Sequence, residues 1–178
     1  MHATRVLTAQ NIEFLRQGRQ LIQGLSDELY QEGVPPLGKS GVGCHFRHCL
    51  DFYSCFAEGL SQGRIDYDLR DRDSGVEKNR KRAVETIDSI IEILESLAEK
   101  APEHPLEVSV DCPGETAGGP FWSRSTLLRE LQMLSGHTVH HYALIAVLLR
   151  ARGFDPGAEF GVAPSTLTFE KLSASCAG

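Results

Sequence analysis

The sequence predicts an all-α protein, a four-helix bundle that forms a single domain over residues 1–178. Two observations predict this architecture. Four segments carry apolar residues at helical spacing, and strand-like alternation is confined to one short stretch. With 178 residues, 41% of them apolar, the chain is long enough to bury one hydrophobic core.

The first helix is expected from Thr8 to Gln31, and the second from Ser40 to Leu60. The apolar stripe of the first consists of Ile12, Leu15, Ile22, Leu25 and Leu29. The connection GVPPLGKSGVG (33–43) contains the G-x-x-x-x-G-K-S spacing of a phosphate-binding loop. Such a loop needs a preceding strand and free backbone N–H groups, whereas here a helix precedes it and Pro35 and Pro36 remove two donors. We therefore interpret the stretch as a helix connection.

The third helix is expected to begin at Ser74, because Ser74 and Glu77 form a capping box. Its apolar stripe consists of Val84, Ile87, Ile91, Leu94 and Ala98. The fourth helix is expected to begin near Ser125 and to end at Arg150–Gly153, where cationic residues followed by glycine are typical of a helix C-terminus. Its stripe consists of Leu128, Leu131, Leu134, Leu144 and Leu148.

The connections are expected to contain little regular structure. The stretch GRIDYDLRDRD (63–73) is too charged and too rich in aspartate for a strand in a core. Four prolines exclude a helix between 102 and 123, where LEVSVDC (106–112) alternates like a short edge strand. The tail after Gly153 is expected to form a loop whose apolar side chains pack across the bundle. These side chains are Phe160, Val162, Leu167 and Phe169.

The composition excludes several classes of function. A net charge of -6 and a pI near 5.6 argue against a nucleic-acid-binding protein. The sequence has no apolar run of membrane-spanning length, and its N-terminus lacks the hydrophobic centre of a signal peptide. Its five cysteines, without CxxC spacing, indicate reduced thiols, so a cytoplasmic location is expected.

Histidines on two of the predicted helices form the candidate site. His137 and His141 lie one helical turn apart on the stripe of the fourth helix, and His48 lies on the second helix. Imidazoles at this spacing can bind one metal ion, and a third from a facing helix leaves a coordination position open for substrate. The alternative is that each is a core or edge histidine bonded to a neighbour. The unfavourable burial of unpartnered imidazoles favours the metal site.

Other residues near these histidines could contribute to the site. Asp51 shares the face of His48, either as the acceptor that orients this imidazole or as an ordinary helix carboxylate. Cys44 and Cys55 share the same face and could supply thiolates, but small apolar side chains are the favoured interpretation. On a helical wheel, His45 is rotated away and His140 lies at the edge of the stripe, so neither is expected to bind the metal.

The two histidine-bearing segments, GCHFRHCLDFY and GHTVHHYALIAVLLRARG, resemble those of the DinB/YfiT-like superfamily of four-helix-bundle candidate metalloenzymes. The family pattern corresponds to His48 with Asp51 in the second helix and to His137 with His141 in the fourth. The resemblance implies an up-down-down-up bundle with a long, partly extended connection before the fourth helix. It also implies a divalent metal ion, often zinc or nickel, held by three histidines.

Two functions follow from the resemblance. Some family members are thiol-dependent transferases or isomerases, which implies a low-molecular-weight thiol as co-substrate and a small-molecule acceptor. The segment from Arg64 to Asp73 and the loop 113–123, with Phe121 and Trp122, would then line the substrate mouth, unless they are plain surface loops. The alternative is a non-catalytic metal-binding or stress-associated module that acts as a homodimer.

Overall fold

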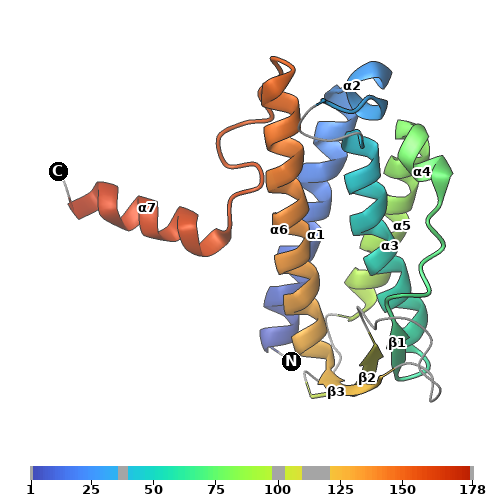
Figure 1. Cartoon of the computed structure of the whole chain (residues 1–178). Coiled ribbons are helices and arrows are strands. Elements are labelled where there is room, and N and C mark those ends of the chain that lie inside the picture. The colour runs from blue at the N-terminus through green and yellow to red at the C-terminus, as the bar shows by residue number, and fades with distance from the viewer. Residues whose placement is uncertain (1, 36–39, 98–102, 110–120, 177–178) are drawn as a thin grey trace.

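The computed structural model describes residues 2–35, 40–97, 103–109 and 121–176. Four long helices form the bundle: α1 (His2–Gly24), α3 (Val42–Leu60), α5 (Arg80–Leu97) and α6 (Leu127–Ala151). Helices α1 and α3 occupy opposite corners, because each packs against both α5 and α6. In Figure 1, α1 and α6 run upward and α3 and α5 run downward. The structure is predominantly helical, which confirms the predicted fold class, and the direction of the helices agrees with the up-down-down-up order.

Two of the predicted helices are each divided into a short and a long helix. The first consists of α1, which begins earlier than expected, and α2 (Asp27–Gln31). Ser26 separates them, and its hydroxyl caps α2 by accepting the N–H of Leu29 at 3.1 Å. The third consists of α4 (Ser74–Lys78) and α5, separated by the extended residue Asn79.

The third predicted helix also differs in its cap and in its buried face. Asp73, not Ser74, is the capping residue of α4, and its carboxylate accepts the N–H of Gly75 at 2.7 Å. The buried face of α5 is shifted by one residue from the predicted stripe, since Val84 and Ile91 are only half-buried. Its buried residues are Ala83, Ile87, Ile90, Leu94 and Leu97. Ala98 lies outside the described residues.

A small three-stranded sheet closes one end of the bundle, with β2 (Pro105–Ser109) between β1 (Arg64–Asp66) and β3 (Ser123–Thr126). The expectation that 63–73 contains no strand is wrong. Its charged residues alternate with Ile65 and Tyr67, which are fully buried, so one face of the segment is apolar. The strand predicted within 106–112 exists as β2, but its predicted position at an edge is wrong. β2 is the central strand, because it pairs in parallel with β1 and antiparallel with β3. Residues 110–112 of that prediction lie outside the described residues.

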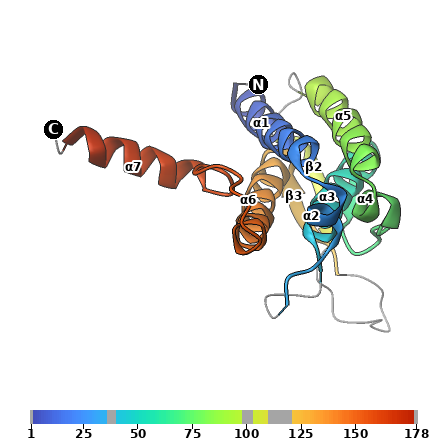
Figure 2. The same ribbon diagram turned by 90° about the horizontal axis from the view of Figure 1, so that it is seen from above.

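The tail after Gly153 was expected to be a loop, and this expectation is wrong in part. The tail contains the helix α7 (Pro164–Cys176). Figures 1 and 2 show α7 projecting away from the bundle. In the described part of the chain it packs along no other helix or strand. Phe160 does pack as predicted, since its ring stacks on Tyr142 with centroids 4.6 Å apart. Phe169 does not, because 70% of it is exposed.

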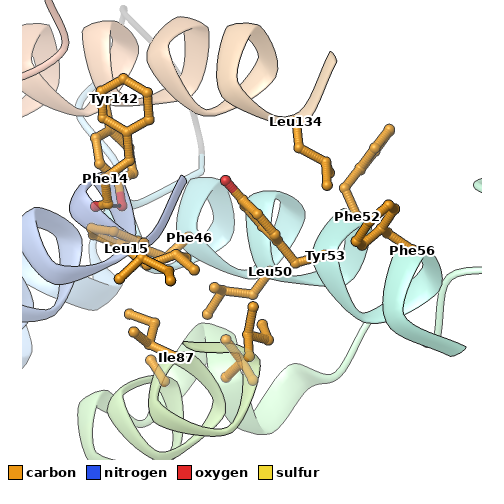
Figure 3. Close-up of a cluster of buried hydrophobic side chains, with 14 of the residues drawn as sticks. Phe14, Leu15, Phe46, Leu50, Phe52, Tyr53, Phe56, Ile87, Leu134 and Tyr142 are labelled. Atoms are coloured by element: carbon orange, nitrogen blue, oxygen red, sulfur yellow. Dashed lines mark hydrogen bonds between the residues drawn. The ribbon is translucent and has the colours of Figure 1, made fainter. Parts of the chain in front are cut away.

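The core lies between the four long helices and fixes how α3 packs against α6. Apolar side chains such as Leu15, Phe46 and Leu50 fill it (Figure 3). A buried polar chain crosses it as well: the Tyr53 hydroxyl donates to Asn11 Oδ1 at 2.7 Å, and Asn11 Nδ2 donates to the carbonyl of Leu131 at 3.0 Å. These bonds join α1, α3 and α6. They restrict sliding of the two histidine-bearing helices, because any shift would leave buried polar groups unpaired.

None of the described helices is both long and apolar enough to cross a membrane.

Candidate metal centre

Helices α3 and α6 pack side by side and bring the three predicted ligands together. His48 comes from α3, and His137 and His141 come from successive turns of α6. Beside them the hydroxyls of Tyr53 and Thr138 lie 3.1 Å apart in the core, which links the two helices next to the site. The position of the histidines therefore depends on a well-packed pair of helices and not on a loop.

The three imidazoles form a compact cluster. One nitrogen from each lies within 4.8 Å of the others. The ring centroid of His48 is 4.9 Å from that of His137 and 4.6 Å from that of His141. The ring centroids of His137 and His141 are 4.7 Å apart. This arrangement is compatible with a divalent metal ion held by three nitrogen ligands.

The cluster lies at the edge of the core and not at its centre. All three histidines are half-buried. The predicted stripe of α6 placed them beside Leu144, but Leu144 is 38% exposed, so this face of the helix borders on solvent. A half-buried position leaves one side of the site accessible to a small molecule.

Burial also keeps two of the candidate ligands neutral. It lowers the pKa of His137 to about 4 and that of His141 to about 3, and the neighbouring imidazoles add to both shifts. Metal binding by imidazole requires the neutral form, with a free lone pair on nitrogen. Both rings are neutral at pH 7 and therefore fit the group that the site is proposed to hold.

An aromatic wall borders the cluster. The ring of Phe52 is 4.0 Å from that of His137 and 5.1 Å from that of His48. Tyr67 stacks on Phe52 at 5.0 Å, and the guanidinium of Arg70 lies over the Phe52 ring at 4.7 Å. Arg70 also lowers the pKa of His137, so a fixed positive charge lies close to the candidate ligands.

The predicted substrate mouth is placed only in part. Arg70, from the segment 64–73, lies beside the aromatic wall. Trp122 instead packs against Arg64, whose guanidinium carbon lies 4.3 Å from the centroid of the Trp122 ring. Phe121 is 63% exposed. Residues 113–120 lie outside the described residues.

Asp51 is buried but differs from an ordinary ion-paired carboxylate. It lines a pocket with Ser54 and Arg82, and its Oδ2 has no hydrogen-bond partner among the described residues. Burial raises the pKa of its carboxyl above the ordinary value, against the opposing effect of Arg47 and Arg70. That Asp51 orients His48 stays a prediction.

The two nearby cysteines lie outside the cluster of ligand atoms found among the described residues. The sulfur of Cys44 accepts a hydrogen bond from Arg47 Nη2 at 3.4 Å. Burial raises the pKa of the Cys55 thiol to about 11, so it is not a thiolate at neutral pH.

The structure corrects the sequence analysis at His45. The wheel placed it away from the site, but its Nδ1 lies 3.1 Å from Nδ1 of His141. The wheel gives only the direction in which a side chain leaves its own helix, and the imidazole of His45 is long enough to reach α6. The spacing of three residues between His45 and His48 could have indicated that both face the same neighbour. His140 is exposed, as its edge position suggested.

Comparisons with known proteins relate the chain to a family and to a curated protein. A family model described as the DinB superfamily matches residues 14–145, a range that includes all three histidines of the cluster. A curated protein of Rhizopus delemar, FK506-binding protein 5, is 33% identical over 103 residues, which are 58% of this chain and 26% of that protein. The chain thus spans about a quarter of the length of this relative.

Proposed function

The chain belongs to the DinB superfamily, and from that premise we propose that it is a metal-dependent enzyme of the thiol S-transferase type. In this proposal His48, His137 and His141 hold a divalent ion. Zinc and nickel are the candidates that the family resemblance implies, and imidazole is a suitable ligand for both. A low-molecular-weight thiol is the co-substrate and a small electrophile is the acceptor.

One observation carries the metal part of the proposal: the convergence of three half-buried imidazoles from two helices within 4.8 Å. Structural metal sites in proteins are normally closed by four protein ligands, whereas catalytic sites have three and keep a position for water or substrate. Three ligands on the accessible side of the bundle support the catalytic type.

The chemistry follows from the donor set and its surroundings. A divalent cation at this position would favour the deprotonated form of a thiol, the nucleophile that the reaction needs. The neutral imidazoles of His137 and His141 contribute lone pairs, and Phe52 packs against His137 and restrains its ring. In the transfer, the sulfur forms a bond to the electrophilic carbon and the thiol proton passes to solvent. The acceptor releases its leaving group with the electron pair of the broken bond.

The test compares metal-loaded and chelator-treated protein in the presence of a panel of low-molecular-weight thiols and an electrophilic acceptor. We expect turnover that requires the metal and that is lost in His48→Ala. His140→Ala is the matched control, since it removes an exposed histidine of α6 and should leave turnover unchanged.

A protein that binds metal but shows no metal-dependent turnover with any thiol would contradict the transferase proposal. It would favour the alternative, a non-catalytic metal-binding or stress-associated homodimer. A protein that binds no divalent metal would contradict the transferase and the metal-binding module, and would leave the stress-associated homodimer.

A further inference from the structure

His45 contacts the three-histidine cluster without belonging to it. Its ring nitrogen Nδ1 lies 3.1 Å from Nδ1 of His141, which is within hydrogen-bonding distance, and the two ring centroids are 5.4 Å apart. Both side chains are half-buried, so competition from water for this hydrogen bond is reduced. The contact joins α3 to α6 one helical turn before His48.

A hydrogen bond between two Nδ1 atoms requires one donor and one acceptor, and each neutral imidazole carries a single proton. If His45 were the donor, the lone pair of His141 Nδ1 would accept the hydrogen bond from His45 and Nε2 of His141 would carry the proton of that neutral ring. Neither nitrogen of His141 would then be free to bind an ion. If His141 is the donor, its Nε2 has a free lone pair, so only this arrangement is compatible with a metal ligand at His141.

We propose that His45 is a positioning residue of the metal centre: it accepts a hydrogen bond from Nδ1 of His141 and thereby directs Nε2 of His141 to the ion. This inference rests on the proposed function, since it concerns the same three ligands. Histidine ligands in proteins usually donate their second nitrogen to an acceptor, which fixes the tautomer and the ring orientation. Here a second histidine takes the place of the more usual carboxylate or carbonyl.

The first experiment measures the affinity of the purified protein for Zn²⁺ by competition with a chromophoric chelator at neutral pH. His45→Leu removes the acceptor and fills similar space, whereas His45→Asn is smaller but keeps an acceptor oxygen close to the place of Nδ1. We expect His45→Leu to bind Zn²⁺ about 10- to 100-fold more weakly than wild type. His45→Asn should retain most of the affinity, and His140→Leu is the matched control, because it removes an exposed histidine whose ring is also close to that of His141.

The second experiment does not depend on a variant. Nitrogen-15 NMR of the histidine side chains in the zinc-loaded wild-type protein distinguishes protonated from metal-bound ring nitrogens. We expect a protonated Nδ1 and a zinc-bound Nε2 at His141. If His45→Leu does not fold, this spectrum decides.

The outcomes separate this inference from the proposed function. If wild type binds zinc, three results would overturn the role of His45 and leave the proposed function intact. They are unchanged affinity in His45→Leu, zinc bound to Nδ1 of His141, and zinc bound to His45. A wild-type protein without affinity for either Zn²⁺ or Ni²⁺ would overturn both proposals.

Discussion

Asp51 is a buried carboxylate whose hydrogen bonding is incomplete among the described residues. Its Oδ2 has no hydrogen-bond partner among the described residues, and burial raises the pKa of the carboxyl. When a folded-state pKa lies above the unfolded value, here 3.8, ionisation is less favourable in the native protein. The favourable contribution to stability is then fully present below the unfolded pKa and is lost as the pH rises through the folded pKa.

We therefore expect Asp51→Asn to increase the free energy of unfolding of the metal-free protein at neutral pH. The gain should shrink as the pH falls through the folded pKa to below the unfolded value of 3.8, where the wild-type carboxyl is protonated in both states. Urea denaturation at the two pH values measures this difference. Asp71→Asn is the comparison, because Asp71 is exposed and acts on the Asp51 carboxyl only as a minor electrostatic cause, so its replacement should change stability much less. Destabilisation by Asp51→Asn at neutral pH would instead indicate a native partner for the carboxylate, as the predicted role towards His48 requires.

At the residue scale, spacing was sufficient to predict the histidine cluster but not its neighbours. Two imidazoles at i and i+4 must leave a helix on the same side, so His137 and His141 could be paired from sequence alone. The approach of His45 to His141 depends on the distance and the angle between α3 and α6. A helical wheel contains neither quantity.

At the scale of elements, the close approach of α1 to α6 depends on Gly18. A Cβ atom at this position would collide with the hydroxyl of Tyr142 and lie 3.0 Å from the ring of Phe46. The Tyr142 hydroxyl cannot simply move aside, because it donates to the carbonyl of Phe14 at 2.8 Å in the core. The absence of a side chain at Gly18 therefore allows the two helices to pack at their observed separation.

Gly18→Ala is expected to destabilise the protein by about 1–3 kcal/mol, the usual cost of overpacking, in spite of the better helix propensity of alanine. Gly136→Ala is the matched control, since a Cβ at this helical glycine of α6 would meet no described atom within 4 Å. It should stabilise the protein by up to about 1 kcal/mol. Chemical denaturation of both variants measures the two effects. An equal response at the two positions would contradict the close approach at Gly18.

The elements that the sequence analysis missed depend on local caps or on distant pairing. Periodicity continues across Ser26 and Asn79, so it joined helices that these residues separate. β1 forms because Ile65 pairs with Val108, a partner more than forty residues away, and its charged neighbours lie on the outer face. Composition averages over the two faces of a strand and therefore concealed this one. The helix α7 has a weak amphipathic pattern and packs along no other described element. Its sequence therefore lacks the periodic apolar stripe by which a buried helix can be predicted.

At the scale of the whole molecule, the bundle and its candidate centre should be independent of α7. Removal of residues 164–178 is expected to leave the melting temperature and the affinity for Zn²⁺ unchanged, because α7 packs along no other described element. Thermal unfolding with and without Zn²⁺ measures both. A longer truncation from residue 154 is the control, because it also removes the buried Phe160, which stacks on Tyr142. That loss should cost about 2–3 kcal/mol. A large loss of stability on the shorter truncation would contradict the exposed position of α7.

The overall architecture was the most predictable feature of the molecule, since four apolar stripes in a chain of this length have few alternatives to a bundle. The candidate metal site was equally predictable from the sequence, because its three histidines lie on two long helices. Their depth was not predictable, since it depends on which face of α6 the other helices cover. The structure places that face at the border of the core, where Leu144 is partly exposed.

The central claim is that three histidines from two helices form a metal centre, and metal analysis of the purified protein tests it most directly. Elemental mass spectrometry should find one divalent ion per chain in wild type and in the control variant His140→Ala. His48→Ala, His137→Ala and His141→Ala, each verified as folded by circular dichroism, should lose the ion. Retention of one ion per chain after all three histidines have been replaced together would contradict the claim.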